Sequence, residues 1–248
     1  MQRTIDLNCD LGEGAGSDDE LMPLVSSVNI ACGAHAGSVE MMVDAVDLAV
    51  ASRVGIGAHP GHFDPEHFGR IERPITPYEV SRLILIQIEQ LYDIAGPKLR
   101  HVKLHGALYH QVAYDVYLAD TTVSDLARLW PEIILFAPAG SPLVDMARAR
   151  GLPVAEEVFA DRTYQRDGTL TPRSRADALV RDEDAAVAQV LQMVREGVVR
   201  ATDGTLVRVR ADTVCLHGDT PEAVDFARRL NAALDLAGIA IKPFTSEA

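Results

Sequence analysis

The chain has 248 residues, a length that α/β barrels commonly reach undivided, so we expect a single domain over residues 1–248. Its formal net charge of −13 argues against nucleic acid and anionic membrane as partners, because both need a basic surface. No apolar run is long enough to span a bilayer, and the three cysteines lack a metal-type spacing, so we expect a cytoplasmic protein.

Short apolar strands alternate with amphipathic helices along the chain, and this alternation indicates a parallel sheet. We count seven strand–helix units and therefore predict a seven-stranded parallel β/α barrel, whose strands would open at one common mouth. Six of the predicted strands end at residues capable of proton or metal chemistry, whereas the strand at 133–136 does not. In chain order these residues are Asp10 and Glu13, His35, His59, Lys103 and His105, Asp161 and Arg162, and His217 and Asp219.

Four helices have clear signals in the sequence. Ser38 is the predicted N-cap of a helix over 39–52. Thr76 and Glu79 have the spacing of a capping box and open the next helix, which ends at Gly96. Further helices are predicted over 184–197 and 220–238. The apolar face predicted for the first of these helices consists of Val39, Met42, Val43, Val46, Ala49 and Val50.

Two segments interrupt the alternation of strands and helices. Residues 198–210 are typical of a hairpin around Asp203 and Gly204, the residue types that a tight primed turn favours. Residues 163–181 show little apolar periodicity and follow a predicted mouth residue. Long loops of this kind are often lids, and a plain surface excursion is an equal alternative.

The first strand carries polar side chains at alternating positions. Asp6, Asn8 and Asp10 share one face, because side chains alternate sides along a strand. Burying three polar groups against helices would be costly, so we expect this face to line the lumen. A structural hydrogen-bond network is the better interpretation for Asp6. Asp10 and Glu13 lie nearer the predicted mouth and are candidate catalytic residues.

Four histidines follow strands and are expected at the mouth, namely His35, His59, His105 and His217. Such a group can serve as general acids and bases, or it can hold a divalent metal together with a carboxylate. Their spacing matches no local metal motif, so we favour acid–base and binding roles and predict no tightly bound metal. The remaining histidines, His62, His67, His101 and His110, are expected to serve packing.

Lys103 and His105 are two residues apart and share a strand face. A lysine inside a barrel needs a carboxylate or a ligand oxyanion as its partner, and we favour a functional role over a purely structural ion pair. Arg162 offers a second cation suited to carboxylate or phosphate recognition. No Gly-x-x-x-x-Gly-Lys-Ser/Thr segment is present, so a nucleotide site of that type is excluded.

Together these segments resemble the LamB/YcsF family of 5-oxoprolinase A subunits, in the order that the family shows. The matching segments are Asp6-Leu7-Asn8-Cys9-Asp10-Leu11-Gly12-Glu13-Gly14, Ser27 to Gly37, Gly57-Ala58-His59-Pro60-Gly61, His105-Gly106-Ala107-Leu108-Tyr109, Glu157 to Arg162, and His217-Gly218-Asp219-Thr220-Pro221. The chain departs from the family pattern at Leu104, at His110 and in the loop over 62–71.

The resemblance implies a barrel similar to the glycoside hydrolase/deacetylase superfamily. It also implies ATP-dependent opening of 5-oxoproline to L-glutamate, with ATP and Mg²⁺ as co-substrate and with the 5-oxoprolinase B and C subunits as partners. On this interpretation the catalytic candidates are Asp10, Glu13, His35, His59, Lys103 and His105. The substrate-binding candidates are Asn8, Asp161, Arg162, His217 and Asp219. Two alternatives remain, an autonomous metal-dependent amidohydrolase or deacetylase and a non-catalytic protein that binds 5-oxoproline for its partners.

Overall fold

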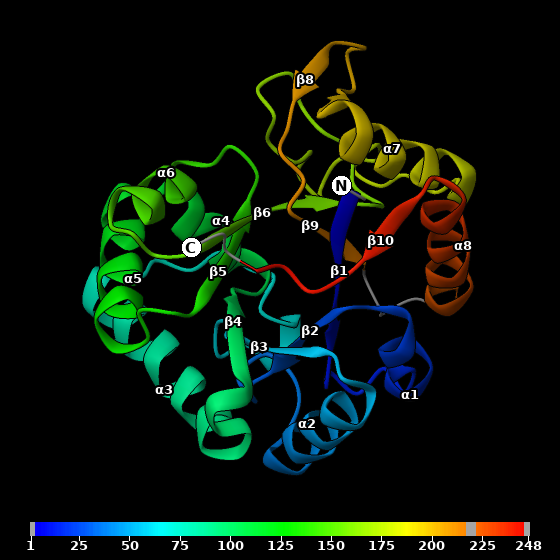
Figure 1. Cartoon of the computed structure of the whole chain (residues 1–248). Coiled ribbons are helices and arrows are strands. Elements are labelled where there is room, and N and C mark those ends of the chain that lie inside the picture. The colour runs from blue at the N-terminus through cyan, green and yellow to red at the C-terminus, as the bar shows by residue number, and fades with distance from the viewer. Residues whose placement is uncertain (1–2, 217–221, 246–248) are drawn as a thin grey trace.

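Seven parallel strands form a closed barrel in the computed structural model, which describes residues 3–216 and 222–245 (Figure 1). The barrel strands are β1 (Arg3–Leu11), β2 (Ser27–Ala31), β3 (Gly55–His59), β4 (Leu99–Lys103), β5 (Ile134–Pro138), β6 (Val154–Phe159) and β9 (Thr213–Leu216). They are hydrogen-bonded in that order, and β9 closes the barrel by pairing with β1. The predicted fold class is therefore confirmed.

The register of the strands places the predicted mouth residues at similar heights. Asp10 pairs with Asn29 across β1 and β2, and His59 pairs with Ala31 across β2 and β3. Lys103 pairs with Phe136 across β4 and β5. Because all seven strands run in the same direction, these three carboxyl ends open at one side of the barrel.

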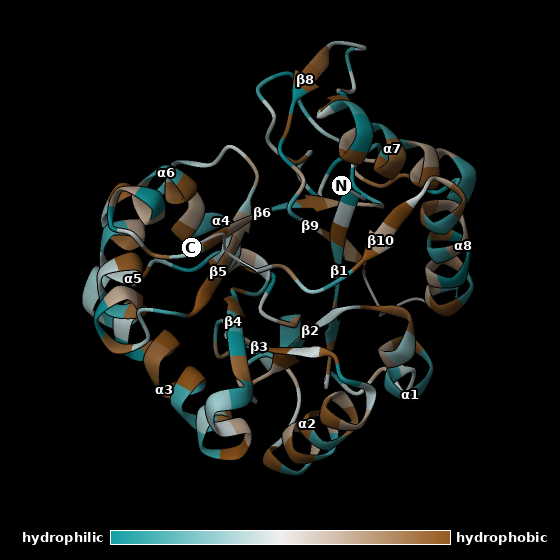
Figure 2. Ribbon diagram, viewed as in Figure 1, coloured by the Kyte–Doolittle hydropathy of each residue, from teal (hydrophilic) through white to brown (hydrophobic). Residues whose placement is uncertain are grey.

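Helices surround the strands and combine hydrophobic with hydrophilic residues along their lengths (Figures 1 and 2). They are α1 (Asp18–Leu21), α2 (Val39–Ser52), α3 (Pro77–Ala95), α4 (Gly106–Tyr114), α5 (Val116–Leu129), α6 (Pro142–Ala149), α7 (Glu183–Glu196) and α8 (Ala223–Leu236). Short 3₁₀ turns span Met22–Leu24, Pro65–His67 and Gly96–Lys98. The apolar faces of the strands and helices form one main core between the barrel and the helical ring.

Local signals in the sequence fix several helix ends. The Ser38 hydroxyl accepts the N–H of Met41 and caps α2, as predicted. Thr76 and Glu79 form the predicted capping box at the start of α3. Gly197 takes a left-handed conformation, with φ of 66°, and ends α7.

Other details differ from the sequence-based expectations. The predicted apolar face of α2 is too wide, since Val39, Val43 and Val50 are 56, 39 and 40 % exposed. The face that α2 buries instead consists of Met42, Ala45, Val46 and Ala49. The seven predicted strand–helix units imply helices after β4 and β5, although their bounds were not assigned. Helices α4, α5 and α6 occupy these places and complete the ring between β4 and β6.

A short hairpin and one further strand lie outside the seven-stranded barrel wall. Strands β7 (Val198–Arg200) and β8 (Leu206–Arg208) pair antiparallel and confirm the predicted hairpin, although residues 201–205 form a longer connection than a tight turn. Strand β10 (Ile239–Ile241) adds parallel to the start of β1. Among the described helices, none has the length and apolarity needed to cross a membrane.

Candidate active site

A cavity of about 410 Å³ opens at the carboxyl ends of the strands. Its wall draws on the ends of β1, β3, β4 and β6, on the start of α4, and on the loops over 68–73 and 163–181. The polar residues that line it are Asp10, Glu13, His59, Arg70, Glu72, Lys103, His105, Tyr109, His110, Arg162, Thr171 and Arg173. The structure thus brings five of the six proposed catalytic residues to one cavity, and the sixth, His35, is buried directly behind it.

Lys103 is buried at the base of this cavity, with 3 % of its surface exposed. Its Nζ lies 2.8 Å from Oδ1 of Asp10 and 3.1 Å from Oε1 of Glu157. Nζ also lies 3.0 Å from Sγ of Cys215 and 3.2 Å from Oδ1 of Asn8. An ammonium group has three hydrogens to donate, so protein partners already engage all of them.

The charge state of Lys103 follows from these neighbours. Burial alone would lower its pKa, because a low-polarity environment disfavours the charged form. The negative charge of Asp10, followed by the smaller effects of Cys215 and Glu157, has a larger influence than burial. Together they raise the pKa of Lys103 well above its ordinary value. Lys103 is therefore charged, and its charge holds Asp10 and Glu157 in place.

Glu157 is a site residue to which the sequence analysis gave no role. It is 1 % exposed, accepts the hydroxyl of Tyr109 at 2.6 Å, and accepts Nδ2 of Asn8 at 2.9 Å. Burial, together with the neighbouring Glu157, raises the pKa of Tyr109 well above its ordinary value. The sequence feature that could have indicated this role is a pair of adjacent glutamates, Glu156 and Glu157, inside an otherwise apolar strand. Only the structure shows that Glu157 faces the lumen.

The lower polar residues of β1 support the site and do not line the cavity. Asn8 is fully buried and bonds to Glu157, Thr213 and Lys103, so it positions other groups, in contrast to the substrate contact expected for it. Asp6 accepts the hydroxyls of Ser26, Ser27 and Thr213. Burial raises the pKa of Asp6 to about 6 despite these hydrogen bonds. The expected structural network around Asp6 is confirmed.

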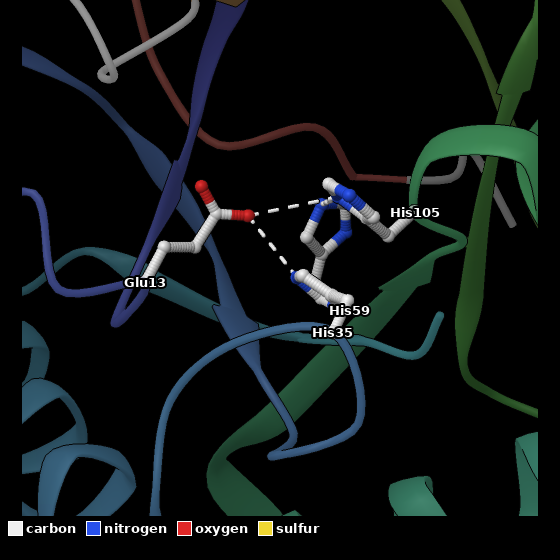
Figure 3. A group of neighbouring side chains, drawn as sticks. All are labelled: Glu13, His35, His59 and His105. Atoms are coloured by element: carbon white, nitrogen blue, oxygen red, sulfur yellow. Dashed lines mark hydrogen bonds and ion pairs between the residues drawn. The ribbon is translucent and has the colours of Figure 1, made fainter. Parts of the chain in front are cut away.

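Three histidines and one glutamate face one another beside the Lys103 cluster (Figure 3). Nε2 of His35 lies 3.1 Å from Oε1 of Glu13, and Nδ1 of His105 lies 3.6 Å from the same oxygen. Nε2 of His59 lies 3.0 Å from Nδ1 of His105 and 3.3 Å from Oδ2 of Asp10. The rings of His35 and His105 stack with centroids 3.7 Å apart.

Backbone carbonyls orient two of these imidazole rings. Nδ1 of His59 lies 2.8 Å from the carbonyl oxygen of Lys103, and Nε2 of His105 lies 2.8 Å from that of Phe68. A carbonyl oxygen only accepts, so both of these nitrogens carry hydrogen. Burial lowers the pKa of His35, and burial together with His59 and His35 lowers the pKa of His105. In their neutral forms, His59 and His105 point lone pairs at each other.

Arginines from two loops form the other side of the cavity. Arg162 is buried and donates to the carbonyls of Ala178 and Thr171, so it holds the loop over 163–181 against the barrel. That loop contributes Arg173 and its neighbours to the cavity wall. His110, expected only to pack, lines the cavity, where its side chain is exposed beside Arg162 and Arg173.

Some predicted site residues lie elsewhere. Asp161 is absent from the lining of the cavity and borders a separate hollow formed with Leu179, Val180 and α8. His217 and Asp219 lie outside the described residues. The structural roles expected for three histidines agree with their contacts: His62 bonds to Gln111, His67 to Asp64, and His101 to Asn29.

Comparison with known proteins places the chain in a family. The profile described as the LamB/YcsF family matches residues 5–248. The chain belongs to the LamB/YcsF family. A Bordetella pertussis protein named as the A subunit of 5-oxoprolinase is 48% identical over 250 residues, which cover 98% of this chain and 99% of that protein. One of the same name from Geobacillus thermodenitrificans is 48% identical over 252 residues, with 99% and 98% covered.

Solved structures agree with this assignment. The crystal structure of the lactam utilization protein from Thermus thermophilus is 40% identical and has a TM-score of 0.90, covering 97% of this chain and 100% of that one. A more distant neighbour, the T48 deacetylase, is 15% identical with a TM-score of 0.52, covering 98% of this chain and 94% of that one. At that identity the likeness shows the fold alone, and it agrees with the deacetylase-type barrel expected from the sequence.

Proposed function

We propose that this LamB/YcsF member is one component, the A subunit, of an ATP-dependent 5-oxoprolinase, which opens 5-oxoproline to L-glutamate together with the B and C subunits. The observation that carries the proposal is the 48% identity, over nearly the whole chain, to proteins named as 5-oxoprolinase A subunits. The cavity is compatible with it, because about 410 Å³ falls within the usual range for small-molecule sites.

The reaction requires an activated carbonyl and a directed water, since the lactam is a stable amide. Water adds to the ring carbonyl carbon, the carbon–nitrogen bond breaks, and the nitrogen takes up a proton. Asp10 is the proposed base that directs the water, because it lines the cavity and the Lys103 ammonium favours its charged form. Asp10 would take a proton from the water and return it to the ring nitrogen as the carbon–nitrogen bond breaks.

Arginines at the cavity wall are suited to the carboxylate of 5-oxoproline. Arg162 already donates to two backbone carbonyls, so its fork is partly occupied. Arg173 extends from the same loop and lines the cavity, and it is a second candidate for a bidentate contact. On this proposal the loop over 163–181 acts as a wall that brings a cation to the substrate.

ATP enters the proposal as the source of carbonyl activation. Phosphorylation of the amide oxygen would make the ring carbon a better electrophile. After one water has added and the carbon–nitrogen bond has broken, the product is an acyl phosphate, and a second water hydrolyses it to the glutamate carboxylate and phosphate. The sequence offers no phosphate-binding loop of the common type, so we assign ATP handling, with Mg²⁺, to the complex with the B and C subunits.

An autonomous metal-dependent amidohydrolase is the second candidate, and one observation favours it. Glu13, His35, His59 and His105 present four ligand atoms within 4.8 Å of one another, an arrangement that could activate water without ATP. The isolated chain would then hydrolyse an amide by itself. A non-catalytic protein that binds 5-oxoproline for its partners is the third possibility, and it predicts that binding survives loss of Asp10 and His59.

The test is 5-oxoproline-dependent ATP hydrolysis by this chain, alone and with the B and C subunits. Glutamate and ADP should appear together, and only when all three components are present. Glutamate formed by the isolated chain without ATP would favour the amidohydrolase. Unchanged turnover by the complete complex carrying Asp10→Asn would favour the non-catalytic binding role.

A further inference from the structure

We propose that Glu13, His35, His59 and His105 bind one divalent transition-metal ion of the zinc class. The site rests on contacts within this chain and does not depend on the proposed lactam reaction. Figure 3 shows the four side chains together, and the atoms that face one another are Oε1 of Glu13, Nε2 of His35, Nε2 of His59 and Nδ1 of His105. The sequence analysis favoured no tightly bound metal, because no two of these residues have a local metal spacing.

First, two ring nitrogens at the centre of the group face each other, and neither carries a hydrogen when the rings are neutral. Nε2 of His59 and Nδ1 of His105 lie 3.0 Å apart. The opposite nitrogen of each ring donates to a backbone carbonyl, so in the neutral rings both facing nitrogens are acceptors. Two lone pairs at this distance repel unless a proton or a cation lies between or beside them.

The second argument is that negative groups surround this pair. Oε1 of Glu13 lies 3.6 Å from Nδ1 of His105, and Oδ2 of Asp10 lies 3.3 Å from Nε2 of His59. A positive charge placed among these atoms would be attracted by two carboxylates. Lys103 also contacts Asp10, but its Nζ is already engaged by Asp10, Glu157 and Cys215.

The third argument is the spacing of the ligand atoms. Zinc holds nitrogen and oxygen ligands at about 2.0–2.1 Å, so the ligands of a tetrahedral ion lie roughly 3.3 Å from one another. The measured separations are 3.0 Å for His59 to His105, 3.1 Å for His35 to Glu13 and 3.6 Å for His105 to Glu13. These three distances bracket the tetrahedral value and all four ligand atoms lie within 4.8 Å, so one ion could be shared once the stacked rings of His35 and His105 rotate apart.

The fourth argument is the outer hydrogen bonding. Metal-ligating histidines almost always donate their second ring nitrogen to a carboxylate, carbonyl or water. His59 does so to Lys103 and His105 to Phe68, both at 2.8 Å. Nδ1 of His35 has no hydrogen-bond partner among the described residues, and Gly61 packs against it without room for a side chain. His35 is therefore held by packing, with Nε2 directed at the group.

The ligand types indicate the class of ion. Three imidazoles and one carboxylate suit zinc and neighbouring transition metals, whereas magnesium and calcium prefer oxygen ligands throughout. Glu13, His59 and His105 line the cavity, so the ion would have one side open to a water or to a substrate oxygen. That arrangement is typical of sites where a metal polarises a bound group.

The experiment uses the purified full-length chain, freed of metal with a chelator and then titrated with Zn²⁺ by calorimetry and with Co²⁺ by visible absorption. We expect one equivalent to bind and Co²⁺ to show the absorption of a nitrogen-rich, low-coordinate site. Glu13→Gln and His105→Gln should each weaken binding by roughly tenfold or more. His67→Gln is the matched control and should bind as the unmodified chain does, because the side chain of His67 is 43 % exposed and pairs with Asp64.

Two further measurements make every outcome decisive. Circular dichroism and thermal melting establish whether each variant is folded. If His105→Gln does not fold, Glu13→Gln still tests the site, because it keeps the size of the side chain. Anomalous scattering at the zinc edge locates the ion in a crystal of the unmodified chain. The proposal is overturned if the chain binds no ion above background, if His67→Gln loses binding while Glu13→Gln keeps it, or if the ion lies elsewhere.

Discussion

Nζ of Lys103 and Oδ1 of Asp10 lie 2.8 Å apart although the two residues are 93 positions apart in the sequence. They come from β4 and β1, which are not neighbours in the barrel, so the ion pair crosses the lumen. Glu157 reaches the same ammonium from β6. One buried cation thus ties three strands together directly beneath the candidate active site.

Lys103→Met should destabilise the fold as well as remove activity. The substitution leaves Asp10 and Glu157 buried without their counter-charge, a change that typically costs about 3–5 kcal/mol. Chemical denaturation measures the loss, and Lys98→Met, at an exposed lysine, is the control. Equal unfolding free energies for the two variants would show that the ion cluster contributes nothing to stability.

The sequence predicts which strand ends form the mouth of the barrel, but it does not predict which side chains contact one another there. Lys103 is predicted to need a carboxylate or a ligand oxyanion, because a charge inside a barrel is costly to bury. Glu157 went unassigned, since adjacent glutamates in one strand point to opposite faces and the sequence does not say which faces inward. Glu13, His35, His59 and His105 come from separate segments, so no short sequence motif predicts that they lie together.

The fold class can be predicted from the sequence more reliably than the exact faces of helices or the placement of single residues. The capping signals at Ser38 and Thr76 act within one turn of helix, and the structure confirms both. The apolar face of α2 was too wide, because its exact boundary depends on how the helix sits on the barrel. Asp161 was placed at the mouth by its position after β6, whereas it borders a separate hollow.

Asp6 should make stability depend on pH. Its pKa rises from 3.8 to about 6 on folding, mainly through burial, so the folded protein holds a proton that the unfolded chain releases. The stabilisation is complete below the unfolded pKa and is lost as the pH rises through about 6, to a total of about 3 kcal/mol. The unfolding free energy of the unmodified chain should fall by most of this amount relative to Asp6→Asn between about pH 4 and about pH 7. Parallel pH profiles for the two proteins would contradict the assignment.

Gly57→Ala should be destabilising because the barrel interior has no space for the added carbon. A Cβ at Gly57 would lie 2.0 Å from Nε2 of His101, whose ring stacks on Phe136 and bonds to Asn29. Overpacking of this kind typically costs roughly 1–3 kcal/mol. Denaturation of the single and double variants provides a cycle with His101→Ala. The cost of Gly57→Ala should largely vanish in the His101→Ala background, and an unchanged cost would place the strain elsewhere.

Arg173 and Arg175 provide a matched pair on one loop. Arg173 lines the cavity, whereas Arg175 pairs with Asp177 at the surface. If the cavity binds the carboxylate of 5-oxoproline, Arg173→Ala should raise KM for 5-oxoproline by roughly tenfold or more in the complete complex. Arg175→Ala should leave KM unchanged. An equal effect of both substitutions would indicate a general loosening of the loop in place of a direct contact.

The most direct test of the central claim is the stoichiometry of ATP cleaved to glutamate formed, measured with 5-oxoproline, this chain and the B and C subunits. We predict one ADP for each glutamate, no glutamate when this chain is omitted, and loss of both products when Asp10→Asn replaces the unmodified chain. Rapid, ATP-independent formation of glutamate by this chain alone would contradict the account and show a self-sufficient lactam hydrolase.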